Sequence, residues 1–240
     1  MNQLFDFDQV YNFRDMGGYR AADGRTLRWR RLFRSGEPLR MSADEHTRLR
    51  GDVEIKTVID LRSEEEANHP RGLGPLVGAD TVRHHFPMGD PRSKYDARSS
   101  GEWDPGYPNL MESRGAVWAE IMGILANDDA YPAVFHCVTG KDRTGVLGAL
   151  ILGVLGVDET TIIEDFALSQ RGMDRLIADL RARGKISDDN PPNPALGVPV
   201  PAMELMLESL RSKHGNAANF LGKHGVDDDT LQRLVDLLLE

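Results

Sequence analysis

The segment His136 to Gly145, HCVTGKDRTG, contains the residue types best suited to chemistry. Cys137 is the only cysteine of the 240-residue chain, and five residues separate it from Arg143. One tight turn over that length brings a thiolate and a guanidinium to the same tetrahedral anion. A thiolate is a strong nucleophile, and the arginine fork matches phosphate oxygens. The spacing therefore predicts phosphoryl transfer to Cys137, with Arg143 as the phosphate clamp.

The elements on either side would aim the backbone of this segment at an anion. Residues 133–137 (AVFHC) predict a buried strand, and the apolar run that follows Arg143 predicts a helix. N–H groups gather where such a loop enters a helix, and anions bind there. We expect His136 to fix the loop through a backbone hydrogen bond and Thr144 to hydrogen-bond the sulfur as it leaves. The predicted phosphate-binding residues are Val138, Thr139, Gly140, Lys141, Asp142 and Arg143.

The leaving oxygen needs a proton, and four aspartates could supply it. Asp60 ends a predicted strand, and Asp142 lies inside the loop, so these two are the first candidates. Asp90 follows another predicted strand, and Asp104 stands in the sequence GEWDPG. The alternatives are an ion pair for Asp60, a turn for Asp104, and for Asp142 a role in orienting its neighbours. The sequence leaves this choice open.

Three arginines outside the loop are candidate substrate contacts. Arg14 lies in NFRDMGG, Arg34 in LFRSGEP and Arg62 in VIDLRSEEE. The alternative is a structural network of ion pairs near the edge of the sheet. Both interpretations stay open.

Four apolar, β-branched runs predict strands, and helical patterns lie between them. The strands are expected at 31–34, 55–61, 81–86 and 133–137. Ser42, with Glu45 three residues later, is a capping box that begins a helix, and 111–125 has helical spacing. Further helices are expected at 143–155, 158–183, 201–213, 216–224 and 228–239. We predict an α/β fold with a central, mostly parallel sheet of four or five strands, flanking helices and additional C-terminal helices.

The length favours one domain over residues 1–240, with a helical extension from about residue 158 onward. Two connections, 89–108 and 184–201, are rich in Gly, Pro and polar residues. Connections of this length are uncommon inside a domain and are often lids or binding loops.

Composition excludes several classes of function. The net charge of −9, from 29 basic and 38 acidic residues, argues against a nucleic-acid partner. A single cysteine excludes an intramolecular disulfide and a cysteine-rich zinc site, and no converging set of metal ligands is visible. No apolar run approaches the length of a membrane span, and the first residues lack a secretory pattern. We expect a cytoplasmic protein without metal; oligomeric state and export stay open.

Together these segments resemble the protein tyrosine phosphatase superfamily. HCVTGKDRTG is similar to its Cys-x5-Arg-Ser/Thr loop, above all to that of the atypical bacterial members. NFRDMGGY, LFRSGEP and VIDLRSEEE occur in the order usual for that family, and GVDDDTLQRLVDLL near the C-terminus is also similar. The resemblance implies a tyrosine phosphatase-like fold, a phosphocysteine intermediate and no cofactor. It also implies phosphotyrosine, and in some members phosphoserine, phosphothreonine or phosphoinositide, as substrate, and Lys141 resembles a loop lysine of lipid phosphatases.

Other functions account for only part of the pattern. A catalytically silent module that binds phosphorylated ligands would use the same pocket but has no need of a nucleophile. Sulfur or arsenate chemistry would lack a second cysteine to resolve its intermediate. A Walker-type nucleotide loop would need a hydroxyl residue where Asp142 stands and a glycine where Phe135 stands.

Overall fold

Four parallel strands and one short antiparallel strand form the centre of the protein. The computed structural model describes residues 5, 7–68, 72–89 and 106–240. The sheet has the order β1-β2-β5-β3-β4. Its strands are β1 (Arg14–Asp15), β2 (Leu32–Ser35), β3 (Thr57–Asp60), β4 (Val82–His85) and β5 (Ala133–His136). Only the β1–β2 pair is antiparallel in this sheet, so the predicted mostly parallel sheet is confirmed.

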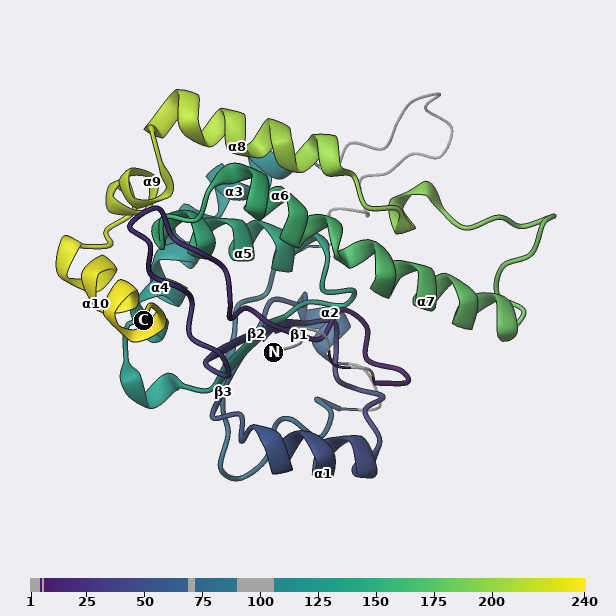
Figure 1. Ribbon diagram of the computed structural model, residues 1–240. Coiled ribbons are helices and arrows are strands. Elements are labelled where there is room, and N and C mark those ends of the chain that lie inside the picture. Colours follow the sequence, from purple (N-terminus) through teal and green to yellow (C-terminus); the bar gives the residue numbers. More distant parts are fainter. Residues whose placement is uncertain (1–4, 6, 69–71, 90–105) are drawn as a thin grey trace.

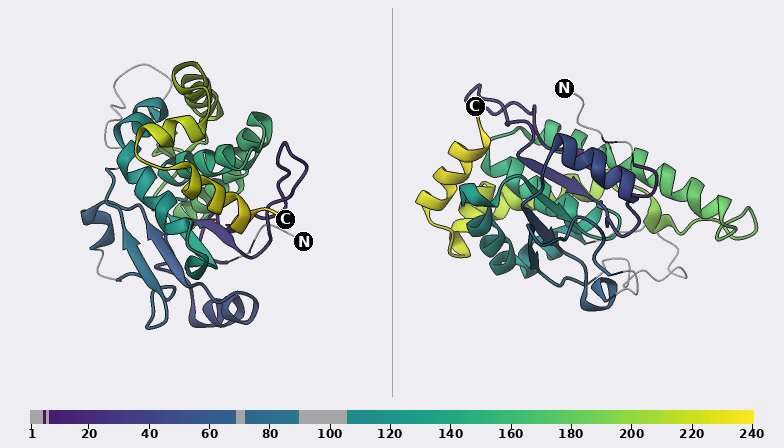
Figure 2. Two further views of the ribbon diagram at one scale, coloured as in Figure 1. Left: turned by 90° about the vertical axis from the view of Figure 1, so that its left-hand side faces the viewer. Right: turned by 90° about the horizontal axis from the view of Figure 1, so that it is seen from below.

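Helices cover both faces of the sheet, with α1 on one face and most of the others on the opposite face (Figures 1 and 2). The helices are α1 (Ala43–Asp52), α2 (Glu64–Ala67), α3 (Tyr107–Ser113), α4 (Gly115–Leu125), α5 (Asp142–Val154), α6 (Glu159–Ala167), α7 (Ser169–Ala182), α8 (Val200–His214), α9 (Ala217–Lys223) and α10 (Asp228–Leu238). The predicted capping box is present, because Ser42 and Glu45 bond each other reciprocally. The C-terminal helices are also as predicted.

Two helical boundaries differ from the prediction. Residues 158–183 form two helices, because the chain turns at Leu168 and α7 then packs Ser169 and Gly172 against the N-terminal segment. Residues 111–125 belong to two helices that meet at Arg114. The strand β1 was not predicted, since two residues are too few for a periodic pattern. A 3₁₀ turn at Pro194–Leu196 lies inside the predicted loop 184–201.

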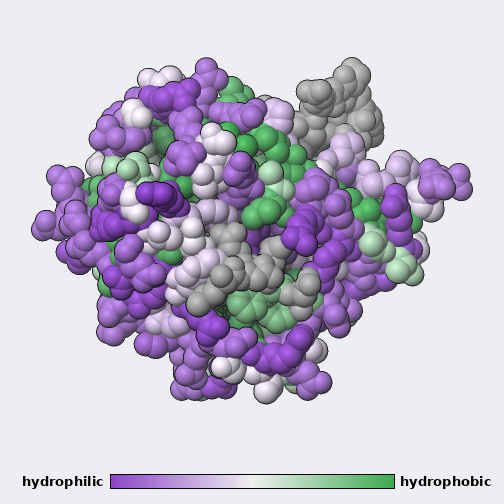
Figure 3. Space-filling view, viewed as in Figure 1, coloured by the Kyte–Doolittle hydropathy of each residue, from purple (hydrophilic) through white to green (hydrophobic). Residues whose placement is uncertain are grey.

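Alternating residues of the strands separate two hydrophobic clusters. Val58 and Val134 face α1, whereas Ile59 and Phe135 face the larger helical layer. Helix α5 is buried along nearly its whole length, as expected of a helix that is apolar on every side. Outside this core the surface seen in Figure 3 is mostly hydrophilic. Among the described helices, none is both long and apolar enough to cross a bilayer.

The parallel register places the ends of three strands at one edge of the sheet. His136 of β5 is paired with Ser35 of β2 on one side and with Asp60 of β3 on the other. The segments that follow these residues therefore leave the sheet together. Ligands of open α/β sheets bind at this carboxyl edge. The predicted site thus lies where the topology favours one.

Candidate active site

The loop between β5 and α5 turns its carbonyl groups outward. Four carbonyls accept hydrogen bonds: Cys137 from the adjacent His136 Nδ1 (3.1 Å), Val138 from the Glu37 N–H (2.9 Å), Thr139 from Asn12 Nδ2 (2.7 Å) and Gly140 from Arg34 Nη2 (3.1 Å). In a trans peptide the N–H points away from the C=O. The N–H groups of residues 138–141 therefore face the opposite side of the loop.

The orientation of these N–H groups suits the binding of an anion. Within the part of the chain that the structure describes, the N–H groups of Val138, Thr139 and Gly140 donate to no backbone or side-chain acceptor. Thr139 is nevertheless only 5% exposed. Buried N–H groups without acceptors are rare in proteins, and successive ones that converge commonly bind phosphate. The start of α5 adds its positive dipole end to the same place.

Two glycines allow the loop to approach the end of β2. Gly140 has a φ of +70°, and a Cβ there would lie 2.5 Å from the backbone nitrogen of Gly36. A Cβ on Gly36 would lie 3.0 Å from the carbonyl oxygen of Val138. Neither position has room for a side chain, because the neighbouring atoms belong to the backbone. The backbones of LFRSGEP and HCVTGKDRTG are therefore packed directly against each other.

Arg143 is fixed in the first turn of α5 by a carboxylate that the sequence analysis missed. Its Nη1 and Nη2 bond Glu66 Oε2 and Oε1 at 2.6 and 2.9 Å. Nη1 also donates to the carbonyls of Leu61 (3.2 Å) and Met88 (3.0 Å). Glu66 completes a capping box with Ser63 at the start of α2. The capping pattern can be recognised in VIDLRSEEE, but it explains Glu66 as a helix-capping residue. It does not indicate that Glu66 also pairs with Arg143.

Asp60 is placed as an ion-pair partner. It is fully buried and accepts bonds from Arg62 Nε and Nη2 (3.0 and 2.8 Å) and from Arg83 Nη2 (2.8 Å). Burial alone would raise the pKa of this carboxyl, but the bonds from the two arginines hold it well below its usual range. An ionised carboxylate has no proton to donate. This geometry favours the alternative of an ion pair for Asp60. Arg62 is engaged in the same pair and also bonds Glu37 at 3.4 Å.

Arg14 and Arg34 form a buried network with Asp165. Arg14 Nε bonds Asp165 Oδ1 at 3.0 Å, and Arg34 bonds the other oxygen. Tyr19 donates to the same carboxylate at 2.9 Å. Burial acts to raise the pKa of Asp165, but the two arginines outweigh it and lower the pKa to about 2. Arg34 also donates to the Gly140 carbonyl, so the network contacts the phosphate loop. These contacts favour the alternative of a structural ion-pair network for both arginines.

Asp142 and Lys141 are both buried at the start of α5. Asp142 Oδ1 accepts a bond from the Tyr107 hydroxyl at 2.5 Å and lies 3.6 Å from Lys141 Nζ. The Lys141 ammonium donates to the carbonyls of Ala195 and Gly197, each at 2.6 Å. The connection between α7 and α8 therefore packs directly on the phosphate loop through the lysine.

The remaining predicted residues have the following places. His136 has a pKa lowered mainly by burial, so the imidazole is neutral and its Nδ1–H bonds the loop carbonyl. The buried Thr144 hydroxyl has no hydrogen-bond partner among the described residues, so the bond to the sulfur is not formed in this conformation. Cys137 is 1% exposed. Asp90 and Asp104 lie outside the described residues.

A recess of about 100 Å³ lies beside the loop. Val138 and Thr139 form one wall, and α7 forms another. The other lining residues are Gln9, Tyr11, Glu37, Arg40, Leu176, Asp179, Leu180 and Arg183. The recess therefore borders the loop at Val138 and Thr139, and Cys137 and Arg143 are not among its lining residues.

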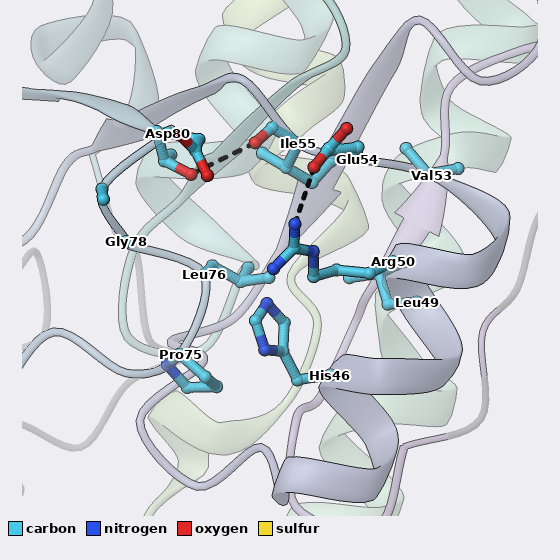
Figure 4. A pocket seen from close by; sticks show the side chains of 12 residues that line it. His46, Leu49, Arg50, Val53, Glu54, Ile55, Pro75, Leu76, Gly78 and Asp80 are labelled. Carbon is cyan, nitrogen blue, oxygen red and sulfur yellow. Dashed lines mark hydrogen bonds and ion pairs between the residues drawn. The ribbon is translucent and has the colours of Figure 1, made fainter.

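A second recess lies far from this chemistry, between α1 and the segment that precedes β4 (Figure 4). Arg50 and Glu54, which both line it, pair at 2.7 Å, and the Thr81 hydroxyl donates to the Ile55 carbonyl. None of the predicted site residues lines it. In the described ranges, no three His, Cys, Asp or Glu side chains are grouped to hold a metal ion.

Comparisons with known proteins identify the family of this chain. A putative tyrosine-protein phosphatase of Cupriavidus necator is 29% identical over 171 residues, which cover 69% of this chain and 62% of that protein. The triple specificity protein phosphatase PtpB of Mycobacterium tuberculosis is 25% identical over 280 aligned positions, 96% of this chain and 97% of that protein. The structure of P. aeruginosa TpbA aligns with 73% of this chain and 85% of that one, at 19% identity and a TM-score of 0.32. A model of the tyrosine phosphatase family matches residues 5–240, and the chain belongs to that family.

Proposed function

We propose that this protein is a cysteine-dependent phosphatase that hydrolyses phosphomonoesters through a phosphocysteine at Cys137. The observation that supports this most strongly is the loop after β5. Its carbonyls bond outward, and the N–H groups of Val138, Thr139 and Gly140, which have no acceptor among the described residues, face the side where an anion would bind. Arg143, held by Glu66, stands at the end of the same loop. Donors fixed in advance stabilise the charge of a transferring phosphoryl group without reorganising during the reaction.

In the first step the Cys137 thiolate attacks phosphorus while the ester P–O bond breaks. A proton passes from the carboxylic acid of Asp142 to the leaving oxygen. In the second step water attacks the phosphocysteine, Asp142 takes a proton from that water, and the P–S bond breaks to restore the thiolate. Atoms and charges balance without a further reactant.

Asp142 is our choice of proton donor among the described aspartates. Asp60 is committed to two arginines, whereas Asp142 lies in the loop and its strongest described bond is to a neutral hydroxyl. Asp90 and Asp104 remain alternatives outside the described residues. Replacing each of the three candidates by asparagine, and comparing kcat/KM on a phosphotyrosine peptide, would identify the donor.

Phosphotyrosine is the substrate class that we favour. The recess beside the loop has apolar walls from Val138, Leu176 and Leu180, which suit the remainder of an aryl phosphate or its flanking residues. Activity on phosphoserine, phosphothreonine or phosphoinositides is the broader alternative. The resemblance to lipid phosphatases rests on Lys141, and here its ammonium donates to two carbonyls of the α7–α8 connection.

We also propose that residues 1–240 work as a single domain that includes the helical extension. Arg14 and Arg34 reach Asp165 of α6, and Lys141 reaches the segment before α8. The extension therefore supplies partners to the residues behind the phosphate loop.

The proposal is tested by assaying the wild type and Cys137→Ser, without added metal, on phosphotyrosine and phosphothreonine peptides and phosphoinositides. We expect wild-type turnover that the variant loses, and a mass increase of one phosphoryl group on Cys137 after acid quenching. Turnover that survives in Cys137→Ser would contradict the mechanism. If the wild type binds phosphopeptides without hydrolysing any substrate, the protein is a phospho-ligand binding module.

A further inference from the structure

We propose that Tyr107 is a positioning residue that fixes the carboxyl group of Asp142 for proton transfer. The inference rests on the proposed phosphatase function and on Asp142 as its proton donor. Tyr107 is the first residue of α3 and is fully buried, and its hydroxyl donates to Asp142 Oδ1 at 2.5 Å. These two residues are 35 positions apart in the sequence, so the contact depends on the tertiary fold.

The phenol is held rigidly and keeps its proton. Its ring packs edge-on against Phe166 of α6, with centroids 5.8 Å apart and planes at 84°. Burial, followed by the negative charges at Asp142 and Cys137, raises the pKa of Tyr107 well above its ordinary value. The hydroxyl therefore donates to Asp142 over the whole working pH range.

One oxygen of the carboxyl group is thereby anchored and the other is left to react. Oδ1 accepts the phenolic hydrogen and lies 3.6 Å from the Lys141 ammonium. An acidic proton then resides on Oδ2, because a protonated carboxyl donates from one oxygen and accepts at the other. Oδ2 gives this proton to the leaving oxygen as the ester P–O bond breaks, and it takes a proton from water in the hydrolysis step. Tyr107 itself neither gains nor loses a proton.

If Tyr107 positions Asp142, the rate loss caused by removing its hydroxyl depends on the leaving group of the substrate. If Tyr107 is only structural, the rate loss does not depend on the leaving group. p-Nitrophenolate is a stable anion that leaves with little protonation, whereas the phenolate of tyrosine requires a proton donor. Misplacement of the Asp142 carboxyl should therefore slow the second substrate much more than the first. A loss of packing or stability would slow both substrates equally.

The experiment compares Tyr107→Phe with a matched control, Tyr131→Phe. Tyr131 is 1% exposed and its hydroxyl bonds the Leu125 carbonyl at 2.5 Å, so the control removes an equally buried hydroxyl away from the phosphate loop. For Tyr107→Phe we expect kcat/KM to fall about 30-fold on a phosphotyrosine peptide and less than about threefold on p-nitrophenyl phosphate. The Kd for the peptide, measured in a Cys137→Ser background, should change less than about twofold. Tyr131→Phe should leave the ratio of the two substrates unchanged.

A double variant completes the test. Adding Tyr107→Phe to Asp142→Asn should cause no further loss on the peptide, because both changes disable the same proton transfer. Equal losses on both substrates, or a full additional loss in the double variant, would overturn the role of Tyr107 while the phosphatase function stands. Absence of Cys137-dependent turnover in the wild type would overturn the proposed function together with this inference.

Discussion

Asp60 and Asp142 are buried aspartates beside one phosphate loop, but their partners differ in kind. Asp60 ends β3 and is surrounded by arginine donors from Arg62 and Arg83. Asp142 begins α5 and bonds a neutral hydroxyl, with the nearest ammonium 3.6 Å away. Two charged donors strongly stabilise the ionised form of a carboxylate, whereas a neutral hydroxyl supplies one hydrogen bond that also fixes the orientation of the group. We therefore expect the identity of the donors, more than burial, to separate the role of Asp60 from the role proposed for Asp142.

The most demanding test of this comparison is Asp142→Asn. We expect kcat/KM on a phosphotyrosine peptide to fall about 10² to 10⁴-fold, since that is the usual contribution of a general acid. The loss on p-nitrophenyl phosphate should be much smaller. The midpoint of urea unfolding should remain close to that of the wild type, because the amide oxygen can still accept the Tyr107 hydrogen bond. A large loss of stability would place Asp142 with the structural carboxylates.

Asp60→Asn should lower stability strongly and activity only slightly, the opposite of Asp142→Asn. Removing a buried charge that faces two arginines leaves them uncompensated, which costs about 3 kcal/mol of unfolding free energy. We expect a lower urea midpoint with an unchanged slope. At a temperature where the variant is folded, its kcat/KM should fall less than about tenfold, equally for both leaving groups. A loss confined to the poorer leaving group would instead restore Asp60 as the proton donor.

Asp165, a third buried aspartate bonded by arginines, should make the stability of the protein depend on pH. Its pKa is about 2 in the folded protein against 3.8 for the free group, because Arg14 and Arg34 outweigh the effect of burial. Since the folded pKa is depressed, this contribution to stability is complete above about pH 4 and is lost as the pH falls through about 2. The contribution amounts to about 2 kcal/mol. Thermal melts of the wild type and Asp165→Asn at pH 2 to 6 should show a shallower acid decline in the variant, and parallel declines would contradict this account.

Arg40→Ala should have the smallest effect. Arg40 lines the recess beside the loop and is half-buried. An exposed ion pair contributes up to about 1 kcal/mol, so KM for a phosphotyrosine peptide with a neighbouring acidic residue should rise about three- to fivefold. The kcat should stay constant, and a peptide with a neutral neighbour should show no change in KM. A change in kcat would mean that Arg40 acts on the chemistry.

Local patterns made the loop and the sheet predictable. Cys137 and Arg143 lie on one strand-to-helix connection, and β-branched runs and the Ser42 capping box mark their elements directly. The roles of the carboxylates were not predictable in this way. Glu66 meets Arg143 across 77 positions, and Asp165 meets Arg14 across 151. Partners so distant leave no periodic signal in a single sequence.

Asp60 shows why position on an element can mislead. The sequence around an aspartate at the end of such a strand looks the same whether its carboxyl group donates protons or binds arginines. The deciding residue is Arg83, which is 23 positions away on β4 and comes alongside only through the parallel register of β3 and β4. Sheet order, which the sequence pattern did not specify, therefore decides the chemistry at this position.

The contact of Lys141 with the carbonyls of Ala195 and Gly197 has a consequence for how the protein matures. During synthesis every residue of the phosphate loop leaves the ribosome more than 50 residues before these acceptors do. Until then the lysine has no such acceptors, and an ammonium is not buried without partners. The catalytic loop should therefore reach its final shape late, after the chain has passed residue 197, so that a nascent phosphatase stays inactive until its helical extension has folded against it.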